Sequence, residues 1–135
     1  MTMNEISAED QIAITKAIMK MLDDWGVPSA GIINVLGLPE GTRTRHIEKF
    51  RLENPLPSDD ATMERVRHLA GIADALRTMY PHNPQQGVAW MNKPHRRFSG
   101  RSPVATMSEE GLSGLIKVRC EVDCTFDWAR ADSNF

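Results

Sequence analysis

The chain has 135 residues, 41% of them hydrophobic and 25% charged, with a formal net charge of −2. This is an ordinary globular composition, enough for one core and two small subdomains. No stretch reaches the roughly 18 apolar residues that a membrane helix needs, and Glu5, Glu9 and Asp10 make the N-terminus too acidic for a signal peptide. We therefore expect a cytoplasmic protein with no membrane contact.

Few residues are aromatic, and no run of alternating β-branched residues occurs, so the sequence predicts an all-α fold.

Cys120 and Cys124 share a helix face but have no partners at metal-ligand spacing, and we interpret them as free thiols. The four histidines are scattered and form no zinc pattern. We expect no metal, no cofactor and no enzymatic activity, because no nucleophile and base, phosphate loop or acidic cluster is recognisable.

The first predicted helix begins behind Ser7, which with Asp10 resembles a capping box. Apolar residues then recur at helical spacing as far as Trp25, and Gly26 to Pro28 end the helix. Ser29 is expected to cap a short second helix over residues 30–36, which Gly37 stops.

A basic third helix is predicted over residues 43–51, after a turn at residues 38–41 and with Thr42 as its N-cap. A short helix, a glycine-containing turn and a basic helix follow one another in a helix-turn-helix. The turn is longer than the tight form and contains a proline, so the register stays open, and a merely solvated basic face is the alternative. The predicted DNA contacts are Thr42, Arg43, Thr44, Arg45, His46 and Lys49, with Arg51 near the phosphate backbone.

A connector with two prolines at residues 53–58 is predicted to divide the chain into an N-terminal region, 1–54, and a C-terminal region, 55–135. The longest helix should run from Ser58 or Asp59 to about Tyr80 and join the two halves. Shorter helices are expected at residues 85–92, from Pro103 behind Ser102 as N-cap, and at about 111–122.

The segment from residue 83 to residue 119 carries an ordered series of turns and helix starts. It resembles the toxin-binding domain of the Xre/MbcA/ParS antitoxin family, and weaker upstream features extend the likeness to most of the chain. The matching residues are Trp90, Met91, Asn92, Pro94, Phe98, Gly100, Pro103, Met107, Gly111, Leu112, Ile116 and Arg119.

The resemblance implies a specific function. Such antitoxins inhibit a cognate RES-domain toxin, which consumes NAD or ADP-ribosylates a target, by covering its active-site cleft, and they commonly repress their own operon through DNA binding. A homodimer or a toxin–antitoxin hetero-oligomer is implied as well. The expected toxin-binding residues are Trp90, Met91, Asn92, Arg96, Arg97, Phe98, Arg101, Leu112, Arg119, Trp128 and Arg130, the last two in a C-terminal tail that is expected to order on the partner.

Two other functions remain open from the sequence. The chain could be a stand-alone helix-turn-helix regulator whose C-terminal half only dimerises, or a small structural adaptor. Because the basic cluster at residues 93–101 contains no acid, it could face an acidic toxin surface or extend a DNA footprint.

Overall fold

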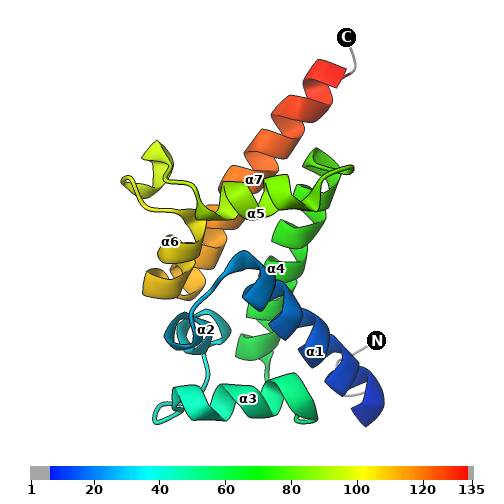
Figure 1. Cartoon of the computed structure of the whole chain (residues 1–135), viewed down its shortest axis with the longest axis vertical. Helices are drawn as coiled ribbons and strands as arrows, with labels where there is room; N and C mark the ends of the chain where they lie inside the picture. The colour runs from blue at the N-terminus through cyan, green and yellow to red at the C-terminus, as the bar shows by residue number, and fades with distance from the viewer. Residues whose placement is uncertain (1–6, 134–135) are drawn as a thin grey trace.

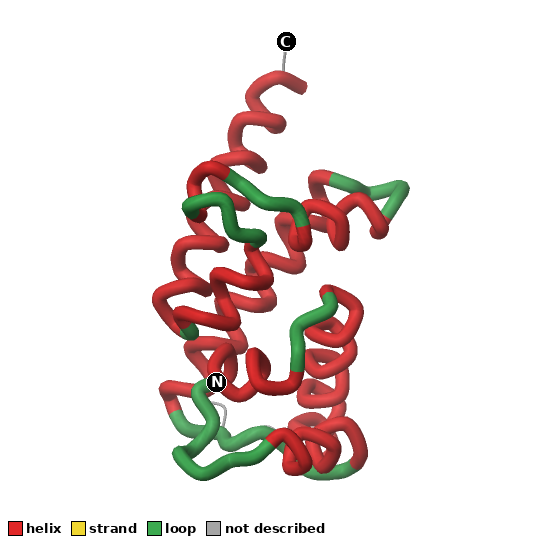
Figure 2. The backbone as a smooth tube through the Cα atoms, turned by 60° about the vertical axis from the view of Figure 1, so that its left-hand side comes forward, coloured by secondary structure: helices red, strands yellow, loops and turns green. Residues whose placement is uncertain are grey.

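The computed structural model describes the backbone of residues 7–133 and the side chains of residues 7–124. Over that range the chain is built of helices and loops without a strand (Figures 1 and 2), which confirms the all-α prediction. None of these helices is both long and apolar enough to cross a membrane. The helices are α1 (Ala8–Trp25), α2 (Ser29–Leu36), α3 (Thr44–Leu52), α4 (Asp60–Met79), α5 (Pro84–Asn92), the 3-10 helix η2 (Arg96–Phe98), α6 (Pro103–Glu110) and α7 (Leu112–Ser133).

Three of the predicted helix caps are confirmed. The backbone N–H of Asp10 donates to Ser7 Oγ at 3.1 Å, and that of Ala105 donates to Ser102 Oγ at 3.0 Å. Asp59 accepts from the N–H of Thr62 at 3.4 Å. These side chains satisfy N–H groups that have no partner within the helix, and they set where α1, α6 and α4 begin.

Three predicted boundaries were wrong. Helix α2 begins at Ser29 itself, with Pro28 at the N-cap, and α3 begins at Thr44 with Arg43 rather than Thr42 at the N-cap. The backbone of the last helix continues to Ser133 instead of ending near Val122. Helix α7 therefore reaches well beyond the body of the molecule (Figure 1).

Residues from both predicted regions share one hydrophobic core. Leu22 and Ile32 come from the N-terminal helices, Leu69 from α4, Met91 from α5 and Leu115 from α7, and each of these side chains is fully buried. Helices α4 and α7 form the most extensive pair (Figure 1). The boundary near residue 54 stays a prediction, but the N-terminal helices pack directly on the C-terminal ones.

The connector between α3 and α4 is held to α1 by a buried hydroxyl. Thr15 Oγ1 donates to the carbonyl of Gln11 at 2.8 Å and accepts from the N–H of Leu56 at 2.9 Å. The side chain of Leu56 is buried in the core. One threonine thereby satisfies a connector N–H that would otherwise be buried without a partner.

Helix α2 lies close against α6. Asn34 Nδ2 donates to the carbonyls of Ser108 at 2.8 Å and Glu109 at 3.2 Å, in the last turn of α6, where carbonyls have no partner within the helix. A Cβ at Gly31 would lie 2.5 Å from Ser108 Oγ, so the approach depends on glycine. This contact positions α6 and therefore the loop between α5 and α6 that leads into it.

The crossing of α6 and α7 also depends on glycine, and it yields a test. A Cβ at Gly114 would lie 2.4 Å from the carbonyl oxygen of Thr106, which is backbone and cannot rotate away. We expect Gly114→Ala to lower the free energy of unfolding by about 1–3 kcal/mol, measured by urea denaturation. Ser113→Ala, at an exposed position of the same helix turn, is the control and should change it by less than about 0.5 kcal/mol. An equal effect of both substitutions would contradict the close crossing.

Candidate functional site

The loop between α5 and α6 is closed on itself by backbone hydrogen bonds. The N–H of His95 donates to Arg101 O at 3.1 Å, and the N–H groups of Phe98 and Gly100 donate back to His95 O at 3.1 and 3.0 Å. Ser99 and Gly100 turn the chain with φ of 57° and 81°. The loop is therefore compact, and it projects from the body of the molecule (Figure 1). It follows α5, which Pro94 prevents from continuing.

His95 packs between two aromatic side chains. Its imidazole lies between Trp90, with ring centroids 4.9 Å apart, and Phe98, at 5.9 Å and edge-on. Nε2 is 3.1 Å from the carbonyl oxygen of Trp90, and because a carbonyl only accepts, Nε2 carries the hydrogen. The stack leaves Trp90 half-buried, with part of its surface available to a partner.

Two of the expected toxin-contacting side chains are instead core residues. Met91 is fully buried and Phe98 is 3% exposed, so neither offers surface to a partner. Sequence periodicity could not separate the two roles, because apolar anchors and core residues have the same chemistry. The buried side chain of Phe98 anchors the loop in the hydrophobic core, and that of Met91 anchors α5 there.

Two polar residues expected at the toxin interface are engaged within the chain. Asn92 Nδ2 donates to Trp25 O at 2.8 Å and to Val88 O at 3.0 Å, which ties the end of α5 to the end of α1. Arg101 bonds Glu109 Oε2 at 2.7 Å and Glu110 Oε2 at 2.5 Å, so it joins the loop to the end of α6.

Glu110 is also bonded by Lys117 of α7, with Nζ 2.5 Å from Oε1. The hydrogen bonds from Lys117 and Arg101 lower the pKa of Glu110 to about 2, which keeps the carboxylate ionised. The loop, α6 and α7 are thus connected by one charged cluster.

What remains accessible in this region is a small basic platform, which we define as Trp90, Lys93, Arg96 and Arg97. Lys93 and Arg96 are exposed, and the Arg97 side chain is 75% exposed with its Nε 3.6 Å from Glu121 of α7. Leu112, also expected at the interface, is half-buried at the start of α7. A rigid loop that presents arginines beside an indole has the residue types that are enriched at protein interfaces.

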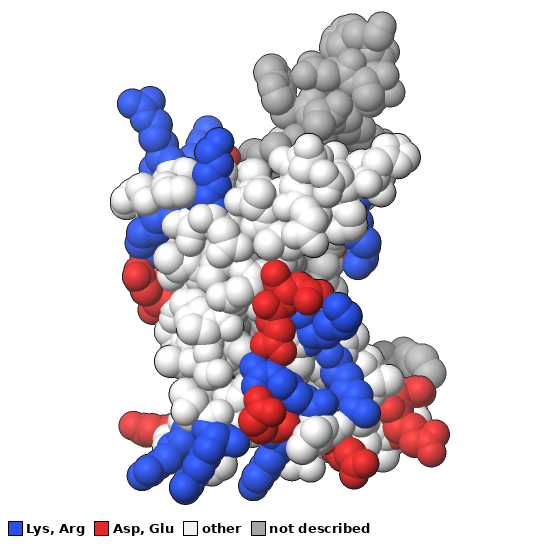
Figure 3. All heavy atoms as spheres, viewed as in Figure 1, with Lys and Arg blue, Asp and Glu red and all other residues white. Residues whose placement is uncertain are grey.

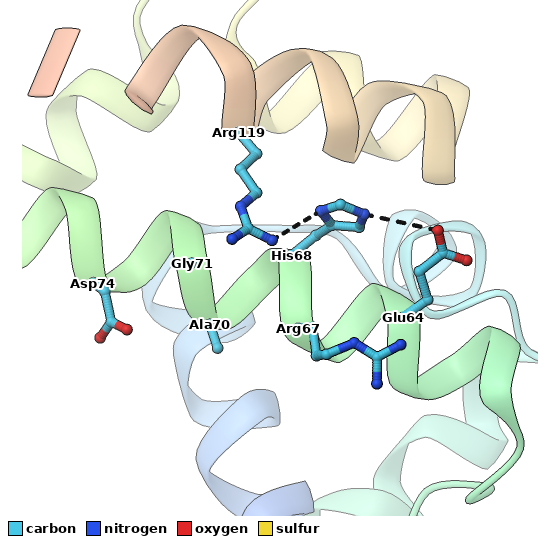
Figure 4. A pocket seen from close by; sticks show the side chains of 7 residues that line it. All are labelled: Glu64, Arg67, His68, Ala70, Gly71, Asp74 and Arg119. Atoms are coloured by element: carbon cyan, nitrogen blue, oxygen red, sulfur yellow. Dashed lines mark hydrogen bonds and ion pairs between the residues drawn. The ribbon is translucent and has the colours of Figure 1, made fainter. Parts of the chain in front are cut away.

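Arg119, which the resemblance places at the toxin interface, faces α4 instead (Figure 4). It lines a hollow of about 600 Å³ with His68 and Gly71 of α4. A Cβ at position 71 would lie 2.7 Å from Arg119 Nε, so the guanidinium rests where α4 has no side chain. The sequence analysis did not predict the contact between Gly71 and Arg119. An isolated glycine in the middle of a long helix is the feature that could have indicated a close approach at this position.

One ring nitrogen of His68 faces Arg119 and the other faces Glu64. Nη1 of Arg119 donates to His68 Nδ1 at 3.2 Å, and Nε2 of His68 faces Glu64 Oε1 at 3.9 Å. A nitrogen that accepts from a guanidinium carries no proton, so His68 is neutral in this arrangement. Burial, and then the positive charge of Arg119, lower the pKa of His68.

The residues predicted to contact DNA lie on α3 and at its N-terminus. Arg43, Thr44, Arg45 and Lys49 are exposed, whereas Ile47 is fully buried as expected. Arginines at the exposed start of a helix suit contact with base edges and phosphates.

Three of the other polar residues here are occupied within the chain. The half-buried Thr42 donates through its hydroxyl to Pro39 O at 2.6 Å, and His46 Nδ1 accepts from the N–H of Arg43 at 3.0 Å. Arg51 is bound by Asp23 of α1 at 2.8 Å and by Glu48. The expected role of Arg51 at the phosphate backbone stays a prediction; in the free chain these two carboxylates hold its guanidinium.

The two basic regions lie in different parts of the molecule. Figure 1 places α3 at one end and the α5–α6 loop toward the other, and Figure 3 shows lysine and arginine side chains gathered at both.

Two predictions lie outside the described side chains. Trp128 and Arg130 fall in the part of α7 for which only the backbone is described. Within the described residues, no group of three or more His, Cys, Asp or Glu side chains could hold a metal ion.

The neutral state of His68 yields a pH test. Its pKa is lower in the folded chain than the usual value of about 6.5, so its contribution to stability is complete above pH 6.5 and is lost as the pH falls below that value. We expect the free energy of unfolding to decline from pH 7 to pH 5 more steeply in the native chain than in His68→Gln. His82→Gln, at an exposed position, is the control and should keep the native slope. Identical slopes for His68→Gln and the native chain would contradict the assignment.

No model of a protein family matches this chain, and no curated protein matches it either.

Proposed function

We propose that this chain is an antitoxin of the Xre/MbcA/ParS type, which binds a cognate RES-domain toxin and covers the cleft in which that toxin consumes NAD or ADP-ribosylates its target. The proposal rests on the resemblance over residues 83–119 and on one observation that supports it. Within the stretch that carries the resemblance, backbone hydrogen bonds close the loop between α5 and α6 on itself, Arg96 and Arg97 in that loop are exposed, and Trp90 is half-buried against His95.

Inhibition by occlusion requires a surface rather than a catalytic group. A preorganised loop loses little conformational entropy when it binds, so more of the contact energy appears as affinity. The exposed arginines suit an acidic rim on the toxin, where complementary charge accelerates association and selects the partner. Trp90 supplies an apolar contact next to them, and Leu112 is a second candidate.

The exposed start of α3 supports a second activity, autoregulation by DNA binding. Arg43, Thr44 and Arg45 are exposed together at one end of the molecule, away from the platform. A complex could therefore hold toxin at one end and operator DNA at the other. The stand-alone regulator remains the alternative function, and it differs in requiring no toxin.

The toxin-binding proposal is tested by co-purifying the chain with the product of its adjacent gene and by assaying NAD consumption with and without the chain. We expect a stable complex and loss of NAD consumption. No complex with the native chain would exclude the antitoxin function and leave the regulator.

The platform is tested by Arg96→Glu combined with Arg97→Glu. Reversing both charges should weaken the complex about tenfold or more, equivalent to ~1.4 kcal/mol, mainly through slower association. The control is Arg77→Glu on α4, because the Arg77 side chain is 72% exposed against 75% for Arg97. Unchanged affinity of the double variant, measured by titration calorimetry, would contradict a role for the platform.

DNA binding is tested by Arg43→Ala combined with Arg45→Ala, on fragments of the chain's own promoter region. If both arginines contact phosphates, the slope of log affinity against log salt should become shallower by about 1.8. Arg77→Ala serves as the control. No DNA binding by the native chain at low salt would exclude autoregulation without bearing on toxin binding.

A further inference from the structure

One face of α7 is turned away from the rest of the chain. The fully buried side chains Leu115, Val118 and Val122 lie on the inner side of the helix, against the core. Since each residue advances the helix by about 100°, position 120 lies opposite them. The outward face is formed by Ser113, Ile116, Lys117, Cys120, Asp123 and Cys124.

This face carries an exposed apolar residue. Ile116 is 41% exposed, and Leu52 on α3 is the other large hydrophobic side chain exposed among the described residues. Cys120 and Cys124 follow Ile116 at intervals of four and are exposed free thiols. Three weakly polar or apolar side chains therefore form one line along the outside of α7.

The charges beside this line reverse sign at its middle. Lys117 and Arg119 precede Cys120, and Glu121 and Asp123 follow it. If a second α7 lay antiparallel across this face, with a two-fold axis at Cys120, the basic residues of each copy would lie beside the acidic residues of the other. A parallel pair would instead place like charges side by side, which is destabilising.

Two of the four charged side chains, Lys117 and Asp123, lie on the outward face itself. Within the chain Lys117 bonds Glu110, Arg119 contacts Asp123 and also bonds His68 of α4, and Arg97 contacts Glu121. The four residues nevertheless keep 52% (Lys117), 36% (Arg119), 54% (Asp123) and 24% (Glu121) of their side chains exposed. Contacts to a second copy would extend these pairs without leaving a buried charge unpaired.

We propose that a second copy of this chain packs on the outward face of α7, antiparallel, with the two-fold axis beside Cys120. Ile116 of each copy then lies at the level of the partner's Cys124, and the two Cys120 thiols meet at the axis. The interface is isologous, as in most homodimers. The described side chains span a seam of about 20 Å over residues 112–124, which is short for a standard interface of roughly 800 Å² per partner, so we expect the dimer to dissociate on dilution.

Sedimentation equilibrium of the free full-length chain tests the association. We expect the native chain to approach twice the 15.1 kDa mass of one chain as concentration rises. Ile116→Glu should remain monomeric at every concentration, and Leu52→Glu should dimerise like the native chain. A native chain that is monomeric throughout, or a dimer weakened equally by both substitutions, would overturn the proposal.

Disulfide trapping tests the antiparallel register without disturbing the apolar contact. With oxidised glutathione as oxidant, two thiols become one disulfide, and the glutathione disulfide is reduced to two molecules of glutathione. Cys124→Ser, which keeps Cys120, should form a covalent dimer. Cys120→Ser should not, because the two Cys124 residues lie about 12 Å apart along the seam, beyond the roughly 7 Å between Cα atoms that a disulfide allows.

Equal trapping through both cysteines would overturn the antiparallel arrangement, as would trapping through Cys124 alone. Both experiments use the free chain and no toxin. Their outcome is therefore independent of whether the proposed function is correct.

Discussion

Helix α6 is packed closely between α2 and α7, and this packing positions both neighbouring helices and the loop before α6. Gly31 lets α2 approach the end of α6, and Gly114 lets α7 cross the backbone of Thr106. At these distances a single methyl group would separate the helices, and protein cores have few voids into which they could shift. With α6 held on both sides, the loop that precedes it has a fixed base.

The distribution of arginines follows from that packing. Arg101, Arg51 and Arg119 each bridge two elements of the chain: loop to α6, α3 to α1, and α7 to α4. Among the arginines expected to bind a toxin or DNA, Arg96 and Arg97 in the loop and Arg43 and Arg45 at α3 face outward. Bridging arginines hold the elements in place, so the outward ones are presented in a defined geometry.

The sequence predicted the fold class and most of the helices because these depend on local patterns. Ser7, Asp59 and Ser102 determine helix starts through hydrogen bonds to their own neighbours, and Gly26 and Gly37 end helices by adopting a left-handed conformation. Such signals act within a few residues, so they can be recognised without knowledge of the fold. The end of α7 was missed because the charged residues beyond Val122 carry no stop signal, and their polarity was interpreted as a tail.

The candidate site was only partly predictable, for a related reason. Sequence alone identified residues 83–119 as the distinctive segment and identified the arginines within it. It could not determine that Met91 and Phe98 are core, that Asn92 and Arg101 bond within the chain, or that Arg119 rests on Gly71. Those outcomes depend on residues far apart in the chain, such as Trp25 with Asn92 and Gly71 with Arg119. The sequence determined which side chains are available for binding; the tertiary structure decided which of them are engaged in holding the fold and which face outward.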